Sequence, residues 1–173
     1  SKTQTYCQAV VGSQVAIVDT RKTLPGLRMA QKYAVAVGGG VNHRIGLFDA
    51  ILIKENHIAA AGGVREALAQ AQLVAQANTT DTLKFVQIEV ETLDQLALAL
   101  QAGANMVLLD NMDLATLRQA VDMNGGRAAL EVSGGVTVER LAELAATGVN
   151  RISIGGLTKD VRAMDYSMRF QVT

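Results

Sequence analysis

The strongest constraint on the fold is a repeated alternation of short apolar runs with longer amphipathic segments. The apolar runs, rich in β-branched and aliphatic residues, lie at 15–18, 50–53, 85–90, 106–109, 128–132 and 151–154. Segments with the pattern of helices lie at 27–37, 64–77, 92–103, 113–123 and 137–148. This alternation predicts an α/β fold, with a parallel sheet covered by helices.

The residues that end the predicted strands narrow the fold class further. Polar residues or glycine stand at their carboxyl ends, namely Asp19, Lys54, Glu89, Asp110, Ser133 and Gly155. In (β/α) barrels the chemistry is built at this end of the strands, although an open doubly wound sheet also binds ligands there. We expect a single α/β-barrel domain over residues 1–173. Because about six strands are visible where a TIM barrel has eight, we expect the barrel to be incomplete or of non-standard strand number.

Composition excludes several classes of protein. The chain has 173 residues, of which 49% are hydrophobic, and its 16 basic and 16 acidic residues leave no net charge. A general nucleic-acid-binding surface is therefore not expected. No apolar run is long enough to span a membrane and no signal peptide opens the chain. The lone Cys7 excludes an internal disulfide, so we expect a cytoplasmic protein.

The amino terminus suggests that something precedes it. Residues 1–12 have the pattern of the middle of a helix without a cap, and Ser1 is not an initiator methionine. We therefore expect an upstream segment that this sequence lacks.

A cluster of basic residues lies between Asp19 and His57, spaced by a Pro-Gly turn and three consecutive glycines. Its members are Arg21, Lys22, His43, Arg44 and Lys54. Like charges on neighbouring loops repel one another, and a ligand with more than one negative group would neutralise them. Ordinary surface charge is the alternative, and it is the better interpretation of Lys2, Lys32, Arg65 and Arg118. His57, like His43, is a candidate donor to a ligand or a structural loop residue.

Two glycine pairs follow neighbouring predicted strands. Gly134 and Gly135 come after Ser133, and Gly155 and Gly156 end the run 151–154. Glycine lets backbone N–H groups approach a phosphate closely, and phosphate sites after the last strands recur in barrels. Either pair alone could be a simple turn. The two pairs together favour a phosphate-binding site.

Two carboxylates end adjacent predicted strands. Glu89 and Asp110 could therefore point into the same mouth, where oxygen ligands suit Mg²⁺ held jointly with substrate phosphates. The alternatives are that Asp110 caps the next helix and that Glu89 is a paired core carboxylate. The direction of Glu131, just before the Ser-Gly-Gly turn, is left open by the sequence.

These features occur within motifs that carry a family resemblance. Residues 19–58 are DTRKTLPGLRMAQKYAVAVGGGVNHRIGLFDAILIKENHI, and VQIEVETL, VLLDN, LEVSGGVT, ISIGGLT and DYSMRF follow in order. Over essentially its whole length the chain resembles the barrel portion of quinolinate phosphoribosyltransferase (decarboxylating), the nicotinate-nucleotide pyrophosphorylase [carboxylating] family. Members of that family start with an additional N-terminal domain and the first barrel strand, which this sequence lacks.

The resemblance implies an enzyme of NAD biosynthesis. It would transfer a phosphoribosyl group from phosphoribosyl pyrophosphate (PRPP) to quinolinate, giving nicotinate mononucleotide, pyrophosphate and CO₂ with the help of Mg²⁺. The implied catalytic residues are Lys54, Glu89 and Asp110, the last two also as metal ligands. The implied substrate-binding residues are Arg21, Lys22, His43, Arg44, Lys54, Ser133, Gly134, Gly135, Gly155 and Gly156.

The resemblance also implies an assembly. Members of the family are homodimers or larger, and the N-terminal domain of one subunit closes the barrel of its neighbour and lends an arginine to the site. This chain alone is therefore expected to be poorly active.

Three other functions remain open at this point. A related phosphoribosyltransferase acting on another small anion would share the fold and the PRPP site. The chain could be a non-catalytic fragment that only binds phosphate-bearing ligands. A barrel aldolase or lyase could use Lys54 as a Schiff base, although the acidic pair and the glycines suit pyrophosphate chemistry better.

Overall fold

The computed structural model describes residues 1–78 and 82–171. The strands are β1 (Ala16–Val18), β2 (Ile51–Ile53), β3 (Val86–Val90), β4 (Met106–Asp110), β5 (Ala129–Ser133) and β6 (Arg151–Ser153). The helices are α1 (Lys2–Gln8), α2 (Arg28–Val37), α3 (Glu55–Ala61), α4 (Val64–Ala77), α5 (Leu93–Gln101), α6 (Leu114–Asn124), the 3-10 helix η1 (Val138–Arg140), α7 (Leu141–Ala145) and α8 (Gly156–Lys159).

The strands form one parallel sheet in the order β1-β6-β5-β4-β3-β2. This order follows the chain in one direction and joins the first strand to the last, as in a barrel. A doubly wound sheet would instead reverse its order near the middle. The free edge of β1 forms a further bridge from Val18 to Val41, so the segment before β2 extends the sheet toward closure. The expected number of strands is confirmed.

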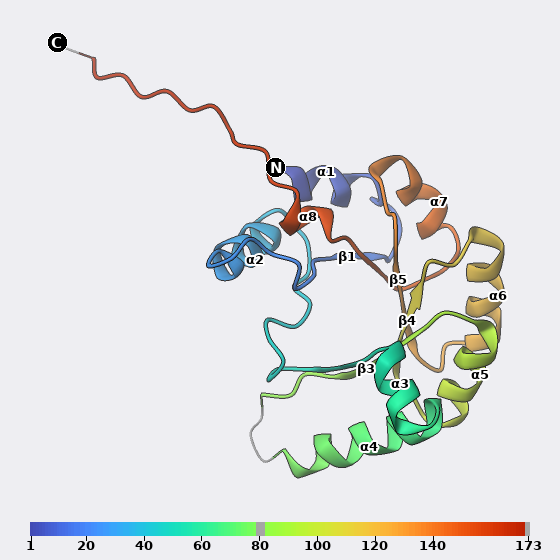
Figure 1. Ribbon diagram of the computed structural model, residues 1–173. Helices are drawn as coiled ribbons and strands as arrows, with labels where there is room; N and C mark the ends of the chain where they lie inside the picture. Colours follow the sequence, from blue (N-terminus) through green and yellow to red (C-terminus); the bar gives the residue numbers. More distant parts are fainter. Residues whose placement is uncertain (79–81, 172–173) are drawn as a thin grey trace.

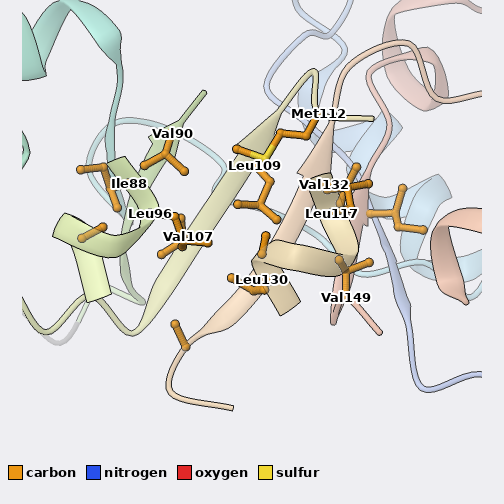
Figure 2. Close-up of a cluster of buried hydrophobic side chains, with 14 of the residues drawn as sticks. Ile88, Val90, Leu96, Val107, Leu109, Met112, Leu117, Leu130, Val132 and Val149 are labelled. Carbon is orange, nitrogen blue, oxygen red and sulfur yellow. The ribbon is translucent and has the colours of Figure 1, made fainter. Parts of the chain in front are cut away.

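The helices cover the outer face of the sheet. Helices α4, α5 and α6 pack side by side, with α4 against β2 and β3, α5 against β3 and α1 against β1 (Figure 1). Alternate strand residues point outward and are buried beneath these helices. Ile88, Val107, Leu109, Leu130 and Val132 pack with Leu96 and Leu117 in this outer core (Figure 2). Burying each such side chain contributes about 1.5–3 kcal/mol.

The inward-facing strand residues are mostly polar, and this places the site. On β3 they are Gln87 and Glu89, and on β5 Glu131 and Ser133, each pair two residues apart. Gln87 and Glu131 are fully buried. A polar barrel interior does not stabilise the fold by apolar contact, so it indicates a binding function.

Several predicted boundaries were wrong. Ser1 does cap α1, because its hydroxyl accepts from the N–H of Gln4 and the Gln4 side chain accepts from the amino group of Ser1. Pro25 lies in a turn before α2, which begins at Arg28. The predicted helix 137–148 is the 3-10 helix η1 followed by the short α7, while α3 and α8 were not predicted.

Other predictions held. Helix α4 has the predicted bounds, and Gly38 ends α2 as expected. Thr92 caps α5 through the N–H of Gln95, but the Gln95 side chain accepts from the N–H of Glu91, so no full capping box forms. Within residues 1–78 and 82–171, the helices are too short or too polar to cross a membrane.

Candidate active site

A cavity of about 410 Å³ opens at the carboxyl ends of the strands. It brings together basic residues from the loops after β1 and α2 with acidic residues that end the strands. The predicted site residues that line it are Arg21, Lys22, His43, Arg44, Lys54, Glu89, Asp110 and Ser133. Residues more than 110 positions apart in the sequence therefore share one cavity, as parallel strands that end on the same rim require.

The basic side of the cavity is partly buried, and in the described part of the chain neither Arg21 nor Arg44 forms an ion pair with a carboxylate. The Arg44 guanidinium donates to the carbonyl of Ala50 at 3.1 Å. Burial and the neighbouring charge of Arg21 lower the pKa of Arg44. The Nε of Arg21 is buried and, within the described part of the chain, has no hydrogen-bond partner. Neighbouring cations with an unpaired N–H donor cost free energy unless a bound anion neutralises their charge and accepts from that donor.

Lys54 and Glu89 form an ion pair across the end of β2 and β3. The Lys54 ammonium donates to both carboxylate oxygens of Glu89, at 2.9 and 2.6 Å. The N–H of Lys54 donates to Nδ1 of His57 at 2.9 Å, which fixes the start of α3. His57 is exposed and does not line the cavity, so it is a structural residue in the first turn of α3.

Asp110 is held by donors on two strands. The Ser133 hydroxyl donates to one carboxylate oxygen at 2.5 Å and the Asn111 amide to the other at 3.0 Å. The alternative that Asp110 caps the following helix is wrong, because Asp113 caps α6 by accepting from the N–H of Thr116. Asp110 thus faces the mouth next to Glu89, as predicted.

The glycine pairs line a second cavity of about 610 Å³ beside the first. Lys22, Asp110 and Ser133 line both, so the two cavities adjoin. Predicted members of the second are Gly134, Gly135, Gly155 and Gly156, joined by Lys2, Lys159 and Asn111. The predicted site is therefore divided into a cationic pocket and a glycine-lined pocket.

Lys2 was expected to be an ordinary surface charge and has a defined role instead. Its ammonium donates to the carbonyls of Gly156 and Asp160, at 2.7 Å each, and to the Asp160 carboxylate at 3.0 Å. These bonds fasten α1 to the loop that contains the second glycine pair.

Comparison with known proteins identifies the family. The sequence model of the quinolinate phosphoribosyl transferase C-terminal domain matches residues 1–169. The chain belongs to the quinolinate phosphoribosyl transferase family. It is 46% identical over 155 residues to the probable nicotinate-nucleotide pyrophosphorylase [carboxylating] of Bacillus subtilis (strain 168), covering 90% of this chain and 52% of that protein. The corresponding protein of Mycobacterium leprae (strain TN) is 43% identical over 169 residues, covering 96% and 57%.

Solved structures agree in fold. NadC from Streptococcus pyogenes superposes with a TM-score of 0.89 at 40% identity, over 97% of this chain and 57% of that one. The nicotinate-nucleotide pyrophosphorylase from Francisella tularensis gives 0.87 at 45% identity, over 94% and 56%. These matches confirm the α/β fold with a TIM-like barrel. The chain spans about half the length of the curated relatives it matches.

One element of the candidate site was missed by sequence reasoning. Lys32, expected on the surface, is buried and donates to Asp19 at 2.5 Å and to the carbonyl of His43 at 3.0 Å. Asp19 also accepts from the N–H of His43 and the amide of Asn42. The pair fixes the loop that presents His43 and Arg44. The available signal in the sequence was the apolar Val35, which lies one turn after Lys32 on the same face of α2.

A second missed element lies beneath the cationic pocket. Glu131 is fully buried and accepts from Nε of Arg151 at 2.9 Å, while Gln87 faces Nε2 of His43 at 2.8 Å. Burial lowers the pKa of His43, against the opposing charge of Glu131. The period-two alternation of β3 and β5 could have placed Gln87 below Glu89 and Glu131 below Ser133.

The acidic residues of the rim fit a metal ion that a ligand helps to bind. Within the described ranges, no cluster of three or more His, Cys, Asp or Glu residues could hold an ion unaided. Glu89 and Asp110 nevertheless offer carboxylate oxygens with lone pairs left after their hydrogen bonds. Mg²⁺ commonly binds through one or two carboxylates, several waters and the phosphates of a substrate. These residues therefore fit a Mg²⁺ ion that arrives with a phosphorylated ligand.

Proposed function

We propose that the protein transfers the phosphoribosyl group of PRPP to quinolinate, with loss of CO₂, to give nicotinate mononucleotide in NAD biosynthesis. The reaction for which the relatives are named supports this proposal. The observation that carries the proposal is a cationic pocket with an unpaired buried Arg21 donor, directly beside a glycine-lined pocket. A dicarboxylate fits the first and a phosphate fits the second.

The cationic pocket suits quinolinate because the substrate has two carboxylates. Arg21 and Arg44 can each grip a carboxylate through two parallel N–H groups, and Lys22 adds a point charge. His43 lies in the same wall. In this arrangement the pyridine nitrogen is held for attack on the anomeric carbon of the ribose, and orientation supplies much of the catalysis.

The acidic rim suits the displacement step. Positive charge develops on the ribose as pyrophosphate leaves, and the carboxylates of Glu89 and Asp110 would stabilise it. Lys54 stays close to Glu89 and would neutralise charge on the departing pyrophosphate. Mg²⁺, proposed to bind with PRPP at Glu89 and Asp110, would supply further charge neutralisation on the pyrophosphate.

Decarboxylation needs little more from the protein. Once the ring nitrogen carries the ribose it is cationic and stabilises the electron pair left on C2 when the C–CO₂ bond breaks, and C2 then takes a proton from solvent. The 2-carboxylate must leave its arginine partner at that point, so positioning matters more than a dedicated general base.

The glycine-lined pocket is proposed to hold the 5′-phosphate of PRPP. Gly134 has a φ of 98°, and a Cβ there would collide with the Asn111 side chain that supports Asp110. Lys22 and Lys159 both pass close to Gly155 and add positive charge. Backbone N–H groups at Ser133, Gly134, Gly135, Gly155 and Gly156 would complete the cradle.

Gly134→Ala is expected to raise the KM for PRPP about tenfold, because strain and the collision with Asn111 together cost about 1–3 kcal/mol. The KM for quinolinate should change much less. The control is Gly126→Ala, which has a similar positive φ of 79° but nothing near its Cβ and lies outside both cavities. Steady-state kinetics with each substrate varied would test this, and an equal effect of the two variants on PRPP would contradict the phosphate site.

Arg44→Ala is expected to raise the KM for quinolinate about 10- to 100-fold, since charge-assisted hydrogen bonds contribute about 1.5–3 kcal/mol each. The KM for PRPP should stay within about threefold. Arg65→Ala, which removes an exposed arginine bonded to Gln101, is the surface control. Equal losses for quinolinate and PRPP would argue against two-carboxylate recognition and favour a related transferase for another small anion.

A homodimer or larger homo-oligomer is proposed as the working assembly. The outer face of α2 exposes Met29, Tyr33 and Val37, which are four residues apart and form one apolar stripe. Contiguous exposed apolar surface marks interaction sites. Cys7 is a free thiol in the structure, in keeping with a proposed cytoplasmic location.

The deciding experiment measures nicotinate mononucleotide formed from PRPP and Mg²⁺ with quinolinate or nicotinate as acceptor. This chain and the full-length gene product are assayed in parallel. Quinolinate-dependent product from the gene product, with little from this chain alone, is the expected result. Product from nicotinate only, or from neither acceptor, would refute the proposed reaction and leave a phosphate-binding barrel.

A further inference from the structure

A buried polar layer lies beneath the cationic pocket, and one of its charges is only half satisfied. Glu131 is fully buried, and Arg151 donates to its Oε2 at 2.9 Å. Its Oε1 has no hydrogen-bond partner in the described part of the chain, and it lies 3.6 Å from Nε2 of His43. A buried carboxylate oxygen without a donor is costly, so its surroundings are suited to a state that places positive charge beside it.

His43 is the group that could place a positive charge beside this oxygen. Its Nε2 lies 2.8 Å from the Oε1 of Gln87, so in the neutral ring that nitrogen carries the hydrogen and Nδ1 is an acceptor. An acceptor is a poor partner for a carboxylate ligand. Protonation at Nδ1 would add a second donor, available to an anion in the cavity that His43 lines, while the Nε2–H bond to Gln87 stays in place and the ring gains a positive charge beside Glu131.

The charges around His43 decide when that proton is present. Arg44 and Arg151 oppose protonation, Glu131 favours it, and burial lowers the pKa of the ring. Asp19 accepts from the backbone N–H of His43 and Lys32 donates to its carbonyl, and these two residues form an ion pair with each other. Lys54 and Glu89, farther along the rim, are also paired. Burial first, and then the charges of Arg151 and Arg44, lower the pKa of His43 and keep the ring neutral in the free protein, whereas a dianionic ligand would add negative charge beside it.

We propose that the dicarboxylate substrate binds together with one proton from solvent, which His43 takes up, and that Glu131 is the positioning residue that stabilises the resulting imidazolium. This inference rests on the proposed quinolinate site. It assigns a positioning role to Glu131, a fully buried residue of the cavity lining. Binding of the anion and binding of the proton are then coupled reciprocally.

The sign of the pH dependence follows. His43 binds no proton in the free protein near pH 7.5 and binds one in the complex, so affinity for the dicarboxylate falls as pH rises. Between the pKa of His43 in the free protein and that in the complex, the fall is about tenfold per pH unit. Below the free-protein pKa the ring is already protonated, and affinity becomes independent of pH.

Titration calorimetry on the full-length gene product tests this directly. Binding heats are measured near pH 7.5 in buffers of different ionisation enthalpy, with quinolinate and with phthalate, a dicarboxylate that lacks a ring nitrogen of its own. About one proton should be taken up per ligand in both cases. His57→Gln, which alters the exposed histidine, should leave that number unchanged. Glu131→Gln and His43→Gln should abolish it, while both variants still bind PRPP as evidence of folding.

The outcomes separate this inference from the proposed function. Quinolinate binding without proton uptake, or uptake that persists in His43→Gln, would overturn the proton coupling and leave the reaction intact. Uptake that is unchanged in Glu131→Gln would overturn the role of Glu131. Failure of the wild-type protein to bind quinolinate at all would refute the proposed function itself.

Discussion

Replacing Lys32 by methionine is expected to lower the free energy of unfolding by about 3–5 kcal/mol, because it leaves the charge of Asp19 buried without its cation. Lys32 and Asp19 are 3% and 0% exposed, and Asp19 also orders the loop through the N–H of His43. Urea denaturation with an unchanged slope would measure the loss. The double variant Lys32→Met/Asp19→Asn should recover part of it, because the isolated charge is then removed.

The matched control for this pair lies in the same structure. Lys84 also bonds a buried aspartate, Asp49, at 3.1 Å, but its own side chain is 54% exposed. Burial works against ionisation of Asp49, yet the N–H groups of Ile45 and Gly46 together with Lys84 outweigh it and lower the Asp49 pKa. Lys84→Met should therefore cost less than about 1 kcal/mol. Equal losses for Lys32→Met and Lys84→Met would show that the Lys32 pair is not the buried anchor described above.

Glu89→Gln is expected to lower kcat about 100- to 1,000-fold with little change in the KM for quinolinate. Glutamine keeps the shape of the side chain but removes the charge that faces the developing positive ribose. It also weakens the two hydrogen bonds that hold Lys54 at the rim. Interactions that strengthen only in the transition state affect kcat and kcat/KM together, so full steady-state kinetics with PRPP and quinolinate are the measurement.

Glu91→Gln provides the comparison for this variant. Glu91 follows β3 by one residue, is exposed and does not line either cavity, so the same chemical change there should leave kcat near the wild-type value. If kcat falls no further in Glu89→Gln than in Glu91→Gln, Glu89 has no catalytic role of the kind proposed.

The candidate site could be predicted largely from residues that end strands. Apolar runs of the sequence lead to Lys54, Glu89 and Asp110. Because parallel strands bring their carboxyl ends to one rim, the sequence alone predicts that these side chains lie close together. The basic cluster between Asp19 and His57 added Arg21, Lys22, His43 and Arg44, all of which line the cavity. Their chemical roles remain proposals.

Burial and pairing could not be predicted in the same way. Lys32 is a charged residue of a type usually found on the surface, yet it is buried because the loop containing His43 folds over α2 and Asp19, directly after β1, pairs with it. His57 was an equal candidate to His43, and only the start of α3 places it outside the cavity. Short helices such as α3 and α8 are set by these tertiary contacts more than by periodicity.

The sequence by itself determined the alternation of strands and helices, the rim at which the polar residues meet and the family to which the chain belongs. These depend on local periodicity and on motifs that are contiguous in the chain. Only the tertiary structure decided that the site is two adjoining pockets, that Lys32 is an internal anchor and that Glu131 lies half-paired beneath His43. Such features depend on which distant side chains share a low-dielectric interior, where one missing partner changes both stability and protonation.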